Sequence, residues 1–307
     1  MRNKALLLMV ALVVPLAGCA TSGSTGAPRT ASAAAAKPDK DKTPPSAAQD
    51  AKAHDEAVAK GDAAWQAQDY DRAIYHYVQA MNKSPHDAAT LAKMGAIEDA
   101  RGNSELAEKA FALAHDADPE EPRIAERLAR LYVRDGRIDD AGQLYTQVLS
   151  RDPTRHRALD GMGEVCLARS DFGQAIRYFD RALQAEKPDT AVVLTHRGYA
   201  KFRSNDPGGA ETDLRAALAI APLDDAWRYL GDLQVGRGDT GAALESLLHV
   251  MDTAQAYNEI GVMLMSARNY QVAREYFTKA IKASPAWFDE AQKNLAVADE
   301  HLHNSSG

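Results

Sequence analysis

Apolar residues between positions 54 and 286 recur with the spacing of short amphipathic helices. In one segment the first predicted helix carries an apolar stripe at positions i, i+4, i+7 and i+8: Ile124, Leu128, Leu131 and Tyr132. The second predicted helix carries another: Ile138, Ala141, Leu144, Tyr145, Val148 and Leu149. Gly136 lies between the stripes, where a residue without Cβ lets the chain leave a helix, and Pro153 ends the second one. The pattern therefore predicts two helices joined by a tight turn.

This pair of predicted helices recurs about every 34 residues. An alanine marks each second helix where the two helices are expected to cross: Ala73, Ala107, Ala141, Ala175, Ala210, Ala243 and Ala273. A small residue marks each first helix about twelve residues earlier: Gly61, Gly95, Ala129, Gly163, Gly198, Gly231 and Gly261. A fixed period with small residues in phase is typical of stacked helix pairs, because each pair buries its apolar face against its neighbours.

The phased small residues resemble the tetratricopeptide (TPR) repeat over residues 54–286. The resemblance implies an all-α fold, a right-handed superhelical solenoid of about seven helix-turn-helix repeats. The amphipathic segment 287–303 has no partner helix after it, so we expect a C-terminal capping helix that covers the last apolar face. Residues 304–307 then form a short tail.

The sixth repeat is irregular. It lacks the closing proline, and the marker alanine Ala273 follows Ala243 after 30 residues. The second helix of this repeat is predicted over about Thr240–Met251 and runs almost directly into the next helix. Both a structural irregularity and a binding seam are compatible with this pattern.

Residues 1–18 are predicted to be a signal peptide rather than part of the fold. Arg2 and Lys4 precede an apolar run of about a dozen residues, Ala5–Leu16. This run is shorter than the ~20 residues that a membrane-spanning helix needs, and its length suits the apolar region of a signal peptide. Residues 19–53 are rich in Ala, Ser, Thr, Gly and Pro and poor in large apolar residues, which predicts a disordered tether.

The sequence Leu-Ala-Gly-Cys at residues 16–19 resembles a bacterial lipobox. The resemblance implies cleavage before Cys19 and attachment of lipid to its thiol, which would anchor the chain to a membrane. Ala20 rather than aspartate follows this cysteine, and in Gram-negative lipoproteins that implies the outer membrane, with the chain facing the periplasm. An ordinary signal peptide followed by a chance cysteine is the alternative.

Composition excludes several classes of function. The net charge of −7 argues against duplex nucleic acid as a ligand, since affinity for it comes largely from neutralising phosphates. The Gly-x-Gly-x-x-Gly string at residues 236–241 is expected in a helix–helix turn, without the strand that a dinucleotide site requires. No clustered metal-ligand pattern or catalytic triad order is present, and Cys166 is expected to be a small core residue. We therefore predict no enzyme activity, no cofactor and no metal.

The remaining candidate site is the groove that the first helices line in TPR-like stacks. The candidate contact residues in this groove are Trp65, Arg130, Val133, Arg134, Leu167, Tyr199, Phe202, Arg203 and Met265. Apolar side chains among charges suit an extended or helical peptide. Many TPR units carry an aromatic residue at this place whatever they bind, so a purely structural role for Tyr199 and Phe202 stays open. Val58 and Asp62 stand where the chaperone-tail carboxylate clamp of some TPR proteins has Lys and Asn, so that ligand is not expected.

The lipobox, tether and repeats together resemble the outer-membrane TPR lipoproteins that assist pili and secretion systems, of the tight-adherence (Flp) or type IV pilus pilotin kind. The resemblance implies a non-catalytic, membrane-anchored interaction scaffold, an assembly factor whose groove holds a secretin or pilus subunit. An adaptor that docks peptidoglycan enzymes in the periplasm is the alternative, and a structural envelope protein without a defined ligand is a third.

Overall fold

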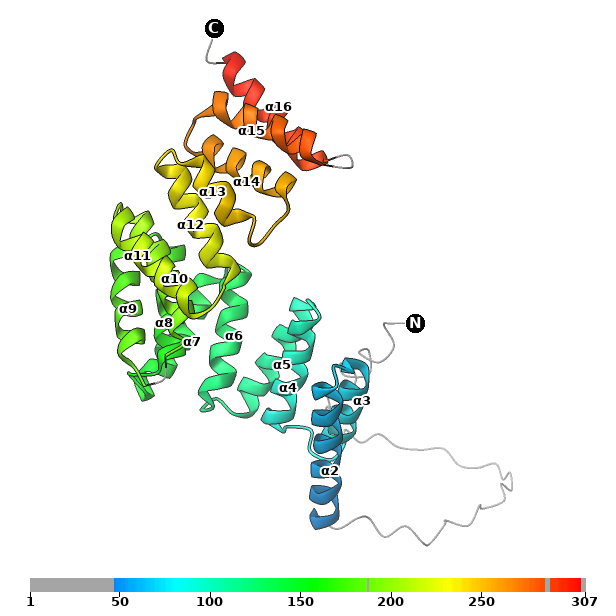
Figure 1. The fold of residues 1–307 in the computed structure, drawn as a ribbon. Coiled ribbons are helices and arrows are strands. Elements are labelled where there is room, and N and C mark those ends of the chain that lie inside the picture. Colours follow the sequence, from blue (N-terminus) through cyan, green and yellow to red (C-terminus); the bar gives the residue numbers. More distant parts are fainter. Residues whose placement is uncertain (1–46, 187, 285–287, 305–307) are drawn as a thin grey trace, which may run out of the picture. The chain divides into compact units, whose positions relative to one another are not determined.

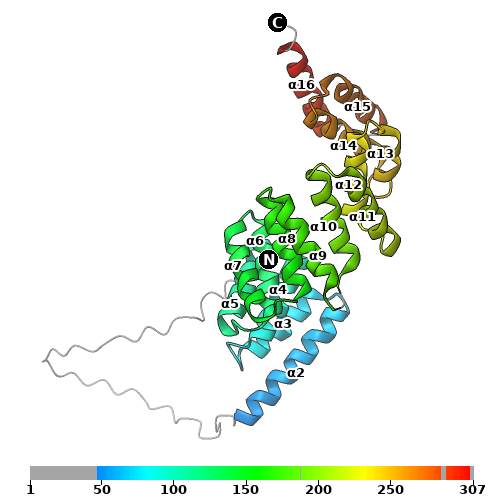
Figure 2. The same ribbon diagram turned by 90° about the vertical axis from the view of Figure 1, so that its left-hand side faces the viewer.

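The computed structural model describes residues 47–186, 188–284 and 288–304. Every regular element in these ranges is an α-helix, and the helices follow one another as hairpin-like pairs (Figures 1 and 2). The main contacts join helices that are consecutive along the chain. None of the helices within these ranges has the length and apolar character needed to cross a membrane.

The described residues form seven helix pairs and one further helix. The pairs are α2 (Ala47–Gln66) with α3 (Tyr70–Met81), α4 (Ala88–Ala100) with α5 (Ser104–Ala117), α6 (Pro122–Arg134) with α7 (Ile138–Arg151), α8 (His156–Ala168) with α9 (Phe172–Gln184), α10 (Thr190–Arg203) with α11 (Pro207–Ile220), α12 (Asp224–Gly236) with α13 (Thr240–Leu247), and α14 (Thr253–Ser266) with α15 (Tyr270–Ala283). The further helix is α16 (Asp289–Asn304). The predicted all-α solenoid of about seven repeats with a last single helix is confirmed.

Small residues hold the two helices of each pair close together. All seven marker alanines of the second helices have 0% exposed surface. On the first helices, a Cβ added to Gly163 would overlap the ring of Phe179, and one added to Gly261 would overlap that of Phe277. Both rings are fully buried. The small residues that recur about every 34 positions therefore mark places where two helices cross closely. At such a crossing an aromatic ring of one helix packs against the glycine backbone of the other.

Each turn within a pair contains one residue whose backbone has a positive φ, the left-handed conformation. Gly136 has φ of +76°, as its predicted place after a helix requires, and Gly238 has φ of +83°. Four other pairs use Gln68, Ser170, Asn205 or Arg268 at the corresponding turn. Gly236 ends α12 and Thr240 begins α13, so the Gly-x-Gly-x-x-Gly string lies in a helix–helix turn as predicted.

Two boundaries differ from the sequence prediction. Helix α2 begins at Ala47, seven residues before the predicted start of the repeats, and Asp50 in its first turn pairs with Lys83 at 2.9 Å. Alanine is a strong helix former, so this small-residue segment can extend the helix once such a contact holds it. In the sixth repeat, α13 ends at Leu247, before the predicted Met251. Asp252 caps α14 with a capping box, which separates the two helices.

Helix α16 packs against α15 and α14, in the place of the predicted cap. Ala291 and Ala298 are buried, and Asn294 donates a hydrogen bond to Asn258 of α14 at 3.0 Å. The predicted signal peptide, Cys19 and residues 20–46 of the predicted tether lie outside the described residues.

Candidate functional site

The first helices of successive repeats lie side by side over much of the chain. Direct contacts join α6 with α8, α8 with α10, α10 with α12 and α12 with α14. The surface that these helices share is called here the first-helix face. It is the surface on which the sequence placed the candidate groove.

Two stacked tyrosines form an aromatic shelf on this face. Tyr199 of α10 and Tyr229 of α12 have ring centroids 4.4 Å apart and planes inclined by 23°. Arg203 donates from Nη1 to the Tyr199 hydroxyl at 2.6 Å and lies 5.0 Å from the centre of the Phe172 ring. Burial raises the pKa of Tyr229 to about 12, so it stays neutral. The shelf therefore offers fixed aromatic surface with a cation at its edge, an arrangement suited to anchoring an apolar side chain.

Phe202 and Asp232 extend this region. The Phe202 ring lies beside Gly236 of α12, where a Cβ would come within 3.5 Å of it. Burial raises the pKa of Asp232, and the positive charge of Arg203 opposes that rise. The region thus combines apolar rings with charges that are partly withdrawn from water.

A half-buried histidine of α10 contacts two carboxylates of α8. His196 Nδ1 lies 2.9 Å from Asp160 Oδ1, and its Nε2 lies 3.8 Å from Glu164 Oε1. Burial alone would lower the pKa of His196, but the charges of Asp160, Glu164 and Asp225 raise it to about 9. Burial raises the pKa of Glu164, and the positive charge of His196 opposes that shift. The imidazolium is therefore a fixed cation that links α8 to α10.

The stability of the chain should depend on the charge of His196. Its folded pKa of about 9 exceeds the ordinary 6.5, so the imidazolium stabilises the fold fully below pH 6.5 and this contribution is lost as the pH rises through 9. We expect the free energy of unfolding to fall by up to about 3 kcal/mol more in the wild type than in His196→Gln between about pH 6 and pH 10. Urea denaturation across this range measures the difference, and parallel curves for the two proteins would contradict it.

The other candidate contact residues fall into two groups. Val133, Leu167 and Met265 are partly buried and pack against the cores between helices, so much of each side chain already has a structural role. Arg130 is exposed, and Arg134 pairs with Asp99 at 2.9 Å. Trp65 packs against the core cluster around Phe111 and also lines a shallow pocket.

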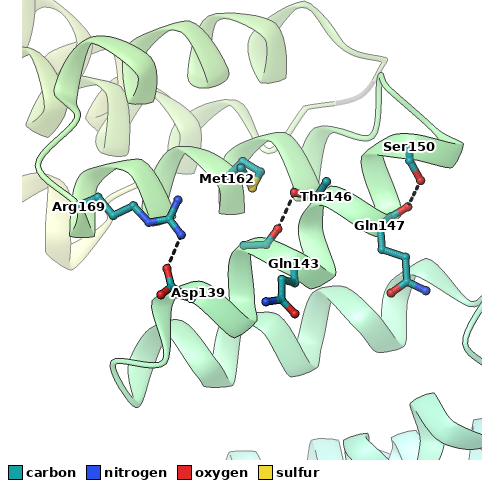
Figure 3. Close-up of a pocket in the computed structure, with 8 residues that line it drawn as sticks. Asp139, Gln143, Thr146, Gln147, Ser150, Met162 and Arg169 are labelled. Atoms are coloured by element: carbon teal, nitrogen blue, oxygen red, sulfur yellow. Dashed lines mark hydrogen bonds and ion pairs between the residues drawn. The ribbon is translucent and has the colours of Figure 1, made fainter.

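A second pocket, of about 650 Å³, lies between α7 and α8 (Figure 3). Most of its lining residues are polar, and several of them find partners nearby. Thr146 donates to the Gly142 carbonyl at 2.7 Å, and Arg169 pairs with Asp139 at 2.6 Å. Because several of its polar groups are paired with one another and no aromatic ring lines it, this pocket is a poorer candidate for a ligand site than the aromatic shelf.

Metal and thiol chemistry find no support in the part of the chain that the structure describes. No group of three or more His, Cys, Asp and Glu side chains there is arranged to hold a metal ion. Cys166 is buried, and this burial raises the pKa of its thiol, which disfavours the nucleophilic thiolate form. Its predicted role as a small core residue agrees with its packing beside Phe179.

Sequence reasoning missed Tyr229 and the His196 cluster. Tyr229 lies on α12, which carries none of the candidate contact residues, and only packing of α12 against α10 brings it to Tyr199. The pairing of His196 with Asp160 likewise joins residues 36 positions apart. A search for side chains one repeat apart could have found both.

Models of the tetratricopeptide repeat match residues 126–191 and 254–286. The chain is 30% identical over 176 residues to the probable UDP-N-acetylglucosamine–peptide N-acetylglucosaminyltransferase SPINDLY of Hordeum vulgare, a match that covers 52% of this chain and 18% of that protein. It is 37% identical over 101 residues to cellulose synthase operon protein C of Pseudomonas fluorescens, covering 33% of this chain and 8% of that one. The chain thus spans less than a fifth of the length of these relatives.

Solved structures show the same fold. A tetratricopeptide repeat protein from Parabacteroides merdae superimposes with a TM-score of 0.61 at 19% identity, covering 80% of this chain and 99% of that one. PilW, a widely conserved type IV pilus biogenesis factor, superimposes with a TM-score of 0.50 at 17% identity, covering 79% of this chain and 98% of that one. The chain therefore carries tetratricopeptide repeats and folds as a TPR solenoid, an architecture that generally binds protein or peptide partners.

Proposed function

We propose that this chain is a non-catalytic, lipid-anchored scaffold of the bacterial envelope that assists assembly of a pilus or secretion system by holding a protein segment on its first-helix face. The single observation that carries the binding role is the aromatic shelf of Tyr199 and Tyr229 with Arg203 at its edge. Stacked aromatic side chains beside an arginine are the residue types in which binding energy concentrates at protein interfaces.

The place of action rests on the N-terminal sequence. The apolar run before Cys19 and the lipobox-like residues 16–19 support export and attachment of lipid, and Ala20 supports the outer membrane, facing the periplasm. The likeness in fold to PilW is compatible with an assembly role but does not identify a partner.

Crosslinked co-purification from the native envelope tests the proposal. We expect the tagged wild type to recover secretin or pilus subunits, and the double variant Tyr199→Glu with Phe202→Glu to lose at least nine-tenths of them, because buried carboxylates oppose an apolar anchor. The matched control changes two side chains exposed on second helices, Tyr75→Glu with Leu113→Glu, and should recover the wild-type amount.

Two results would contradict the proposal. One is recovery of the same subunits in the same amount by the wild type and by Tyr199→Glu with Phe202→Glu, with circular dichroism and thermal midpoint unchanged. This result would place the binding site elsewhere on the chain. Recovery of cell-wall enzymes in place of pilus or secretion subunits would replace the assembly role with that of an adaptor for peptidoglycan enzymes.

A further inference from the structure

Helix α6 carries four arginines along one side. Arg123, Arg127, Arg130 and Arg134 are spaced by 4, 3 and 4 residues, and all four are exposed. At 3.6 residues per turn these spacings keep them within about 60° of the helix circumference. The buried residues Ile124, Leu128 and Leu131 occupy the side that faces the core. This set of arginines is called the arginine stripe.

Three members of the stripe have no ion-pair partner among the described residues. Arg134 is paired with Asp99, at 2.9 Å, whereas the side chains of Arg123, Arg127 and Arg130 make no ion pair or hydrogen bond with any residue that the structure describes. Arg127 lies 5.9 Å from the centre of the Phe111 ring, which carries no charge. The carboxylate adjacent to Arg127 in sequence, Glu126, is already held by Arg155 at 2.7 Å. Three exposed guanidinium groups, each about one helical turn from the next, therefore remain available to an anion.

The charge of the stripe is only partly offset from within the chain. Burial lowers the pKa of Arg127, and the positive charges of Arg130 and of Arg157 on α8 lower it further, while the carboxylates of Asp99 and Glu126 raise it and do not outweigh the lowering. Arg130 is near enough to Glu164 to lower the pKa of that carboxyl, but the ion-pair partner of Glu164 is His196. An incoming carboxylate would relieve this repulsion between like charges.

The stripe is peculiar to α6 among the helices of this face. The corresponding residues of α4 include three alanines, and its one cation, Lys93, is held by Asp62 at 2.8 Å. The corresponding residues of α12 include Asp225 and Asp232. Positive charge is thus concentrated on the third repeat, and negative charge lies on the sixth.

We propose that the arginine stripe binds an acidic segment of the partner protein, an inference that rests on the proposed function and names the chemistry of its ligand. Guanidinium groups bind carboxylates through paired, charge-assisted hydrogen bonds, which favours acidic side chains as the ligand. The stripe is about 16 Å long, so an extended segment with about three acidic residues at alternate positions matches it. The net charge of −7 on the whole chain disfavours large polyanions such as nucleic acid or an anionic bilayer.

Fluorescence anisotropy with the full-length chain tests this inference. The probe is a labelled 12-residue peptide of alternating Glu and Ser, and its counterpart has Gln for every Glu. We expect the Glu peptide to bind at least tenfold more tightly than the Gln peptide, with an affinity that falls as salt rises. Arg127→Gln with Arg130→Gln should weaken binding at least tenfold. The control Arg177→Gln with Arg215→Gln, two exposed arginines of second helices, should leave it unchanged.

Three results would overturn the inference. One is equal affinity for the Glu and Gln peptides, and another is unchanged binding by the stripe variant. The third is tighter, stripe-dependent binding to a single-stranded oligonucleotide or to phosphatidylglycerol vesicles. Such surface substitutions change stability by only about 0.5 kcal/mol, so loss of binding through unfolding is detectable by thermal denaturation.

Failure here is distinguishable from failure of the proposed function. If envelope crosslinking recovers a partner that depends on Tyr199 and Phe202 but not on the stripe, the acidic ligand is wrong and the scaffold role stands. If recovery depends on neither set, the scaffold role on this face is wrong.

Discussion

Replacing Ala141 with tryptophan is expected to lower the thermal midpoint of unfolding by on the order of 10 °C. Ala141 is completely buried in α7, in a core cluster with Ala125, Ala129 and Tyr145. An indole cannot fit where a methyl group already fills the space, so α6 and α7 must separate. Overpacking by far smaller groups already costs about 1–3 kcal/mol, and we expect more here.

The matched control is Gln143→Trp, which places the same side chain on an exposed position of the same helix. This control should melt within about 2 °C of the wild type, because surface changes rarely exceed about 0.5 kcal/mol. In a solenoid each repeat contacts only its neighbours, so hydrogen exchange in Ala141→Trp should accelerate most in the third and fourth repeats. An unchanged midpoint would contradict the assignment of Ala141 to the helix crossing.

Replacing Cys19 with alanine is expected to release the chain from the membrane almost completely. The proposed lipid is attached through the Cys19 thiol, and each buried CH₂ of an acyl chain contributes about 0.8 kcal/mol to membrane binding. We expect the wild type to enter the detergent phase on Triton X-114 partitioning and to incorporate labelled palmitate, and the variant to do neither.

The chain supplies its own control for this experiment, because its one other cysteine is Cys166. Cys166→Ala removes a buried thiol from the fourth repeat and should leave both partitioning and labelling unchanged. Recovery of the wild-type chain in the aqueous phase would contradict the proposed lipid anchor, and so would retention of Cys19→Ala with the membrane.

The repeat architecture could be predicted because close helix crossings impose small residues at fixed places. Gly163 and Ala175 illustrate this, since one lies under a ring and the other is fully buried. The limits of the elements were less predictable. Ala47–Ala53 reads as a tether from composition alone, and it becomes helical next to a contact such as Lys83 with Asp50, which sequence order does not reveal.

The candidate site was predictable only in part, for two physical reasons. Tyr199 and Arg203 were found because they occupy repeated positions on one helix face, but Tyr229 and His196 depend on packing between repeats. Two of the four residues of the arginine stripe, Arg130 and Arg134, were among the candidate contact residues predicted from the sequence, and the other two were not. A comparison of one position across repeats overlooks a pattern that runs along a single helix.

Site-specific photocrosslinking in the native envelope tests the central claim most directly. A photoreactive amino acid would replace Arg130, Tyr199 or Asp232 on the first-helix face, and Tyr75, Leu113 or Arg177 on second helices. The account predicts one shared partner band, a pilus or secretion subunit by mass spectrometry, from the first three positions and none from the others. The same band from the second-helix positions, with none from the first-helix face, would show that the partner binds the opposite surface.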